Sequence, residues 1–386
     1  MRAPERVAAA LRALPRPVCA YVYDTAAARG RAAEVRAALP PTATLLYAVK
    51  ANGHPALVQA LATACDGLEV ASGGELALAV AAGARRIVFG GPAKTDAELA
   101  AALAAGALVN VESGHELRRL DAAARAAGRV ADITVRVNRA GAALPGSHAM
   151  TGTATPFGVD ERDLPDVLAL AAALPAIRVH GFGLHAVSNN LDAAAHATFV
   201  AEALDWSRAR AAAHRVDLRV VNVGGGLGVD YTGAAVMDLA VLRAGLAGLD
   251  LTGLDLIVEP GRILAADAGW YAAEVLDLKH THGRWFAVLR GGTHHFRLPA
   301  AWGYSHPFTV LPVDDWPYDW ARPQVSGVAV DAVGELCTPR DVLARAHPVS
   351  RLRVGDVLVF ARTGAYGWDI SHHDFLRHPH PRIVVL

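Results

Sequence analysis

The chain has 386 residues, in which 37 Lys and Arg side chains balance 37 Asp and Glu side chains. A formal net charge of +0 provides no basic field to hold a nucleic-acid backbone or an anionic membrane, so we expect neither as a partner. Hydrophobic residues make up 53% of the sequence and charged residues 19%, which excludes a disordered chain and supplies apolar side chains for a large core. The length favours two domains over one simple core.

The cysteines and the first residues bear on the cellular compartment. Cys19, Cys65 and Cys337 cannot all pair with one another, and a chain of this size needs no disulfides. Charged side chains interrupt the apolar run over residues 1–17, so we expect no signal peptide. No stretch reaches the roughly 20 apolar residues that a membrane helix requires. We therefore expect a cytoplasmic protein.

Between residues 44 and 261, short β-branched runs alternate with Ala- and Leu-rich stretches of helical spacing, a pattern typical of parallel βα units. Helices are expected, for example, over 75–82 and 97–105. The expected strands cover residues 44–50, 67–72, 86–91, 108–113, 132–138, 179–186, 219–225 and 255–261. This pattern predicts an α/β fold with a closed (β/α)8 barrel of the TIM type over residues 25–271.

After residue 271, short alternating runs are broken by Gly, Pro and His, which predicts an antiparallel β domain. The expected strands there cover residues 274–281, 285–290, 325–333, 356–361 and 382–386. Residues 17–24 are strand-like and precede the first barrel strand. We therefore expect residues 1–24 and 272–386 to form this second domain together.

The chemistry of such a barrel lies at the carboxyl ends of its strands. Lys50 ends the first strand, where partial desolvation allows a lysine to lose its proton and form a Schiff base. Gly224, Gly225 and Gly226 end the seventh strand, and consecutive glycines let backbone N–H groups approach a phosphate. Each motif is weak by itself, since a snorkelling lysine or a plain turn would give the same pattern.

Two further strand ends carry polar side chains. The eighth strand ends in Glu259, followed by Gly261 and Arg262, and the sixth ends in His185, with Ser188 just beyond. Because these ends converge on one cavity, a role facing a ligand is favoured over a structural role for each of them.

Several motifs, taken in order, resemble the fold-type III pyridoxal-phosphate decarboxylases, the family of the ornithine, arginine and diaminopimelate enzymes. The resemblance covers nearly the whole chain. It rests on Tyr47-Ala-Val-Lys50-Ala-Asn52, Glu69-Val-Ala-Ser72-Gly-Gly-Glu75-Leu76, Gly224-Gly-Gly226, Glu259-Pro-Gly-Arg262, Glu335-Leu-Cys337 and Gly364-Ala-Tyr366-Gly367. It implies pyridoxal 5'-phosphate as the cofactor and a homodimer with the active site at the subunit interface.

The resemblance also implies roles for individual residues. Lys50 matches the lysine that binds the cofactor covalently, His185 the histidine stacked on its ring, and Glu259 the acid that pairs with the pyridine nitrogen. Cys337 matches the cysteine that enters from the other subunit and protonates the product carbon. The remaining cofactor-binding positions are Glu69, Ser188, Gly224, Gly225, Gly226, Gly261, Arg262 and Tyr366.

Departures from the family pattern bear on the substrate. Enzymes for basic amino acids usually carry an acid directly after the cysteine, where this chain has Thr338, and diaminopimelate enzymes place an aromatic residue where this chain has Ala301. The segments rich in His and Arg resemble the siderophore-biosynthesis branch, which decarboxylates citryl-diaminopropionate or a related precursor. We expect its carboxylates to bind Arg297, His294 and His295, and we expect Asp341 to be a further substrate-binding residue.

Alternatives remain open at this point. One alternative substrate is diaminopimelate. Another is an amino acid tethered to a carrier protein, which would reach the site past the loop over residues 139–158. More distant alternatives are a racemase, against which Glu259 argues because such racemases set an arginine at the pyridine nitrogen, and a non-catalytic carrier of the cofactor. His372, His373, His378 and His380 allow a structural zinc, but we expect no metal.

Overall fold

The computed structural model describes residues 3–141 and 144–386 of the chain. It divides into two compact units. The barrel unit comprises the described parts of Arg29–Asp230 together with Ala235–Leu264, and the sheet unit comprises the described parts of Met1–Ala28 together with Tyr231–Ala234 and Ala265–Leu386.

The barrel unit contains a closed ring of eight parallel strands, as predicted. In chain order they are β2 (Thr44–Ala48), β3 (Gly67–Val70), β4 (Ile87–Phe89), β5 (Leu108–Val111), β6 (Ala131–Asn138), β9 (Ile177–Gly183), β11 (Val220–Gly224) and β12 (Asp255–Val258). Their order around the ring is β5-β4-β3-β2-β12-β11-β9-β6, and pairing between β5 and β6 closes it. Most of their side chains are buried, as expected for a barrel covered by helices.

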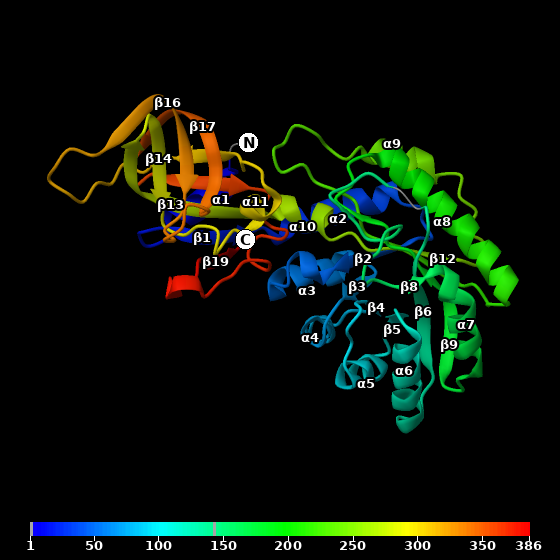
Figure 1. Ribbon diagram of the computed structural model, residues 1–386. Coiled ribbons are helices and arrows are strands. Elements are labelled where there is room, and N and C mark those ends of the chain that lie inside the picture. The colour runs from blue at the N-terminus through cyan, green and yellow to red at the C-terminus, as the bar shows by residue number, and fades with distance from the viewer. Residues whose placement is uncertain (1–2, 142–143) are drawn as a thin grey trace. The chain divides into compact units, whose positions relative to one another are not determined.

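Helices alternate with the strands and lie outside the ring (Figure 1). Ser72, Thr95 and Ser113 each cap a helix by accepting a hydrogen bond from a backbone N–H three residues later. The helices are α2 (Thr25–Ala38), α3 (Pro55–Ala64), α4 (Gly73–Ala81), α5 (Asp96–Ala105), α6 (Gly114–Ala126), α7 (Leu164–Ala173), α8 (Ala193–His214), α9 (Leu239–Leu246) and α10 (Arg262–Ala265).

The loop expected to close over the site, residues 139–158, lies partly outside the described residues. Within its described part, β7 (His148–Ala149) pairs with β10 (Val187–Ser188), directly after the sixth barrel strand. The next short strand, β8 (Val159–Asp160), pairs with β6. These pairings anchor the middle of the loop and the residues that directly follow it to the barrel unit.

The sheet unit is built on one continuous set of eight strands. They are β1 (Cys19–Tyr23), β13 (Gly269–Thr281), β14 (Arg284–Leu289), β15 (Phe308–Leu311), β16 (Gln324–Val333), β17 (Val342–Arg353), β18 (Val357–Ala361) and β19 (Arg382–Val385). The order is β15-β18-β13-β14-β16-β17, with β1 between β13 and β19. Two short helices, α1 (Glu5–Arg12) and α11 (Leu298–Trp302), complete the unit.

The sheet differs from the expected antiparallel arrangement in two pairs. β1 runs parallel to β19 and β14 runs parallel to β16, while the other pairs are antiparallel. Strands β15 and β17 were not among the expected strands. Residues 17–24, which were expected to join this domain, contain β1, and β1 pairs with β13 along its whole length.

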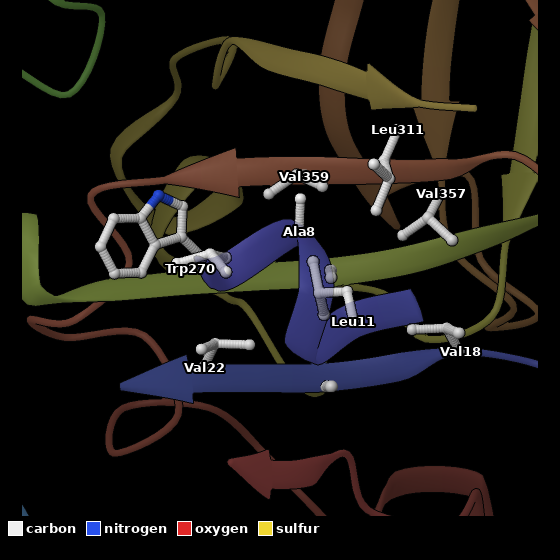
Figure 2. Packing of buried hydrophobic residues seen from close by; sticks show 11 residues of the cluster. Ala8, Leu11, Val18, Val22, Trp270, Leu311, Val357 and Val359 are labelled. Carbon is white, nitrogen blue, oxygen red and sulfur yellow. The ribbon is translucent and has the colours of Figure 1, made fainter. Parts of the chain in front are cut away.

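The apolar face of α1 fills one core of the sheet unit. Figure 2 shows Ala8 and Leu11 of this helix among side chains of β1, β13 and β18, including Val22 and Val359. Ala8 and Leu11 are at most 4% exposed, which explains why the first helix belongs to this unit although the barrel follows it in sequence. None of the helices within residues 3–141 and 144–386 is both long enough and apolar enough to cross a membrane.

Candidate active site

Lys50 lies directly after β2, in the short 3-10 helix η1 (Val49–Ala51), and not in the strand itself. Its Nζ donates a hydrogen bond to Oε2 of Glu69, 2.7 Å away. Glu69 belongs to β3, which pairs with β2. The Glu69 side chain is 6% exposed and that of Lys50 is 45% exposed, so a buried carboxylate holds an accessible amine at the end of the barrel.

Glu259 follows β12, and the pKa of its carboxyl group is raised. Its Oε1 accepts a hydrogen bond from Nδ2 of Asn222 at 2.6 Å. Burial, followed by the negative charge of Glu69, raises the pKa of Glu259 to about 7, although Lys50 and the Asn222 hydrogen bond act in the opposite direction. The carboxyl group therefore changes between its protonated and its charged form near neutral pH.

His185 follows β9 and is a neutral imidazole. Burial, followed by the positive charges of Arg136 and Lys50, lowers the pKa of His185 well below its ordinary value. Its Nδ1 accepts a hydrogen bond from the Gly225 N–H at 3.2 Å. The proton of the neutral ring is consequently on Nε2.

The glycine turn after β11 has no room for side chains. Gly224 and Gly226 have φ of +69° and +106°, a backbone region that favours glycine. A Cβ on Gly224 would lie 2.5 Å from the His185 ring, and one on Gly225 would lie 2.6 Å from the Glu259 carbonyl oxygen. The turn therefore packs directly against two of the other candidate residues.

The sequence predicted that backbone N–H groups of this turn approach a phosphate, and in the structure two of the three N–H groups have partners within the protein. The Gly224 N–H donates to Asn222 Oδ1 at 2.8 Å, and the Gly225 N–H donates to His185. Among the described residues, the Gly226 N–H has no such partner. Gly226 is therefore the member of the turn whose N–H remains for an anionic ligand.

The other predicted barrel residues flank this turn. Gly261 packs against η1, since a Cβ there would lie 2.8 Å from Cβ of Ala51. Arg262 begins α10 and is 6% exposed. Ser188 lies in β10 and is half-buried. All three positions belong to the barrel unit.

Three further polar residues near the strand ends were not predicted from the sequence, namely Asn222, Arg136 and Glu112. Arg136, near the end of β6, donates from Nη1 to Glu112 Oε1 at 2.9 Å and lies over the Phe157 ring at 4.8 Å. Glu112 also accepts hydrogen bonds from the N–H groups of Gly91 and Gly158, both at 2.9 Å. The feature of the sequence that could have identified them is a polar side chain in, or directly after, an apolar barrel strand.

The barrel residues fit the cofactor that the resemblance implies. Lys50 offers a primary amine for an aldehyde, and Glu259 offers a carboxyl group suited to a ring nitrogen. The turn around Gly226 is a cradle that a Cβ would fill, as the close approach of a phosphate requires. An amine, an acid and a phosphate cradle thus belong to one compact unit.

In the sheet unit, Cys337 and Asp341 share the loop between β16 and β17. The Cys337 thiol is exposed. Asp341 is 2% exposed, and its two oxygens accept hydrogen bonds from the N–H groups of Thr293 at 2.6 Å and Leu336 at 2.8 Å. The Asp341 carboxylate thus joins two loops of the sheet unit, and its contact with substrate stays a prediction.

His294 and His295 are also placed differently from the expectation. Both are 0% exposed, and their ring centroids lie 3.7 Å apart. Nδ1 of His295 lies 3.4 Å from the sulfur of Cys19, and burial is the main cause that lowers its pKa to about 2. Both rings are buried inside the sheet unit, whereas the predicted role in binding carboxylates requires contact with a ligand. Of the predicted set only Arg297 is exposed.

Tyr366 and the histidine-rich tail complete the sheet-unit residues. Tyr366 is half-buried and has a φ of +54°. Within residues 3–141 and 144–386, no group of three or more His, Cys, Asp or Glu side chains is placed to hold a metal ion. The Glu335 carboxylate, which lies within 3.6 Å of ring nitrogens of both His294 and His378, is instead paired with the Arg290 guanidinium.

Comparison with known proteins identifies the family. Residues 26–266 match the family model described as "Pyridoxal-dependent decarboxylase, pyridoxal binding domain". The chain is 40% identical over 393 residues to 2-[(L-alanin-3-ylcarbamoyl)methyl]-2-hydroxybutanedioate decarboxylase of Staphylococcus aureus, covering 100% of this chain and 98% of that protein. It is 29% identical to L-glutamyl-[BtrI acyl-carrier protein] decarboxylase of Niallia circulans, covering 94% of this chain and 87% of that protein.

The fold agrees with this match. A solved structure of diaminopimelate decarboxylase from Helicobacter pylori, complexed with L-lysine, superimposes with a TM-score of 0.84 at 25% identity, covering 98% of this chain and 93% of that one. The chain therefore belongs to the pyridoxal-dependent decarboxylase family and is a carboxy-lyase with pyridoxal phosphate as its cofactor.

Proposed function

We propose that the enzyme decarboxylates an amino acid whose side chain carries an amide-linked 2-hydroxybutanedioate group, such as citryl-diaminopropionate. The observation that carries this proposal is the 40% identity, over the full length of both chains, to the staphylococcal decarboxylase named for that substrate. Diaminopimelate decarboxylases from several other bacteria are 29% to 34% identical over smaller shares of the chain. Thr338 agrees with the proposal, because it offers no charge to a distal ammonium group.

Lys50 is the residue that we assign to covalent cofactor binding. The chain has only three lysines, Lys50, Lys94 and Lys279. Lys94 is 4% exposed and donates to two backbone carbonyls and to Glu116, all within 2.9 Å. Lys279 lies on the exposed end of β13 in the sheet unit. Of the three lysines, Lys50 is the one that has an accessible amine and also belongs to the same unit as the glycine turn.

The residues around Lys50 have separate proton-transfer tasks. Glu69 Oε2, 2.7 Å from Nζ, is positioned to accept the proton that Lys50 must lose before it can bond to a carbonyl carbon. Glu259 holds a proton at the ring nitrogen, while Asn222 fixes the direction of its carboxylate. Bound pyridoxal phosphate supplies a ring that accepts the electron pair of the broken bond to the carboxylate. His185, which the family resemblance assigns to the cofactor ring, is neutral and would add no positive charge beside it.

The phosphate of the cofactor is assigned to the glycine turn and its flanks. Gly226 contributes its N–H, and Arg262 contributes a guanidinium at the start of α10. Gly224, Gly225 and Gly261 permit this approach by lacking side chains. Ser188 and Tyr366 are assigned to the phosphate by the family resemblance.

The product carbon needs a proton, and we assign its donation to the exposed Cys337 of a partner subunit. That assignment follows the family resemblance and requires a homodimer whose active sites lie at the interface. We place the enzyme in the cytoplasm, in keeping with its unpaired cysteines.

A second candidate is decarboxylation of an amino acid held by a carrier protein. It is favoured by the similarity to the Niallia circulans enzyme, whose name specifies such a substrate. The same Lys50, Glu259 and Cys337 would serve it, so only substrate presentation differs between the two candidates.

Release of carbon dioxide from purified enzyme tests the proposal. Citryl-diaminopropionate should be turned over with a higher kcat/KM than diaminopimelate, ornithine or a glutamyl carrier protein, and the opposite order would overturn the assignment. Borohydride reduction followed by intact-mass measurement should show covalent cofactor on the wild type and on Lys279→Ala but not on Lys50→Ala. Label retained by Lys50→Ala would refute the role of that lysine.

A further inference from the structure

Two segments of the sheet unit lie side by side, one before α11 and one in the tail after β18. The Arg297 N–H donates to Oγ of Ser371 at 3.0 Å, and the same hydroxyl donates to the carbonyl oxygen of Gly367 at 2.7 Å. The His372 ring also lies 6.5 Å from the His294 ring, measured between centroids. These contacts hold the residue after Ser371 close to Arg297.

Arg297 and His372 are both exposed, although the His372 ring also lies 5.9 Å from the Phe375 ring, measured between centroids. The ring of His373 stacks on Trp368 with centroids 3.6 Å apart and an angle of 11° between the planes. Nε2 of His380 lies 3.1 Å from a carboxylate oxygen of the same tail. His372 is therefore an exposed histidine that directly follows the residue hydrogen-bonded to the Arg297 backbone.

This pair of side chains is tied to the loop that carries Cys337. Asp341, four residues after Cys337, joins that loop to Thr293 and to the segment leading to Arg297. Asp341 also interacts electrostatically with His372. The loop that carries Cys337 and the segments that carry Arg297 and His372 are therefore connected to one another within the sheet unit.

We infer that His372 and Arg297 form the subsite for the distal carboxylates of the substrate, with His372 as a specificity-determining residue. This inference rests on the proposed function, since it needs a substrate with carboxylates beyond its α-amino acid head. An imidazolium and a guanidinium together suit two carboxylates on one 2-hydroxybutanedioate group, because each donates charge-assisted hydrogen bonds. In this subsite the exposed His372 takes the carboxylate-binding role that the sequence predicted for the buried His294 and His295.

The subsite also has an expected pH dependence. Burial, followed by the positive charges of Arg297 and His294, lowers the pKa of His372, while Asp341 opposes this and His373 adds to it. A bound carboxylate favours the charged ring and raises that pKa again. Binding of the distal carboxylates should therefore tighten as the pH falls from 8 towards the ordinary titration range of histidine.

The test compares two substrates in kinetic measurements on the whole enzyme. Citryl-diaminopropionate carries the distal carboxylates, and N3-acetyl-2,3-diaminopropionate has the same amino-acid head without them. His372→Ala should raise KM for the first substrate about 10- to 100-fold, as expected for losing one charge-assisted hydrogen bond, with little change in kcat. It should leave the kinetics of the acetyl substrate unchanged, which also shows that the variant is folded.

Two further variants complete the design. His372→Arg should keep a low KM and abolish its dependence on pH between 6 and 8, because arginine stays charged there. His373→Gln, at the neighbouring stacked ring, should behave as the wild type. The inference is overturned if His372→Ala leaves both KM values unchanged or raises them equally. If the wild type releases no carbon dioxide from either substrate, the proposed function itself fails, and the inference fails with it.

Discussion

Replacing Glu259 with glutamine should stabilise the barrel unit in the absence of cofactor. The pKa of this carboxyl group is about 7, against 4.5 as its ordinary value, because burial and Glu69 both disfavour the charged form. At 1.36 kcal/mol per pKa unit, the charged side chain costs the folded state about 3 kcal/mol. Glutamine keeps the hydrogen bond from Asn222 and carries no charge.

The sign of the pH dependence follows from proton linkage. Because the folded-state pKa lies above the unfolded value, the folded protein binds more protons between pH 4.5 and 7, and the wild type loses stability as the pH rises through this range. The advantage of Glu259→Gln should therefore be largest at pH 8, up to about 3 kcal/mol, and should vanish below about pH 4.5.

Hydrogen exchange in increasing urea, followed on peptides that cover β11 and β12, measures the free energy of unfolding of the barrel unit specifically. Glu98→Gln is the matched control, because hydrogen bonds from the N–H groups of Thr95 and Gly73 lower the pKa of Glu98 and the sign is reversed. That variant should be less stable than the wild type at pH 8. Equal stability of Glu259→Gln and wild type at pH 8 would refute the buried-charge argument.

Two other substitutions test the backbone of the barrel unit. Gly225→Ala would place a Cβ 2.6 Å from the Glu259 carbonyl oxygen, so this variant should bind the cofactor more weakly, as measured by equilibrium dialysis. The control is Gly248→Ala, where an added Cβ meets nothing within 4 Å, and it should bind the cofactor as the wild type does. Gly30→Ala lies within α2, where an added Cβ meets nothing within 4 Å, and should stabilise the enzyme by about 0.5–1 kcal/mol in the same hydrogen-exchange assay. A destabilised Gly30→Ala variant would mean that this helix position is more crowded than the structure indicates.

The sequence was informative about the barrel because the alternation of strands and helices is a local property. All eight barrel strands were located, and the residues at their carboxyl ends, among them Lys50 and Glu259, belong to one unit as expected. Asn222 escaped notice because it lies inside an apolar strand. Its role depends on the hydrogen bond that it donates to Glu259, at the end of the neighbouring strand, and the sequence of one segment alone does not reveal this contact.

The sheet unit was harder to predict because its pairings join distant segments. Strand β17 contains Pro348 and several charged residues, so its own sequence does not resemble a buried strand, and pairing with β16 decides its conformation. His294 and His295 were expected to bind a substrate carboxylate because they lie in a segment rich in His and Arg. Their burial depends on packing against Cys19, Tyr271 and the tail, which only the folded chain determines.

The position of β1 has a consequence for synthesis on the ribosome. β1 pairs with β13 and with β19, and about 360 residues separate β1 from β19. At 5–20 residues per second, roughly 20–70 s pass between the emergence of these two strands. All barrel strands are made in this interval, so the barrel unit can fold while β1 still waits for both of its partners. A nascent chain of this enzyme therefore carries an unpaired strand edge for most of its translation, and that edge is a natural target for a ribosome-associated chaperone.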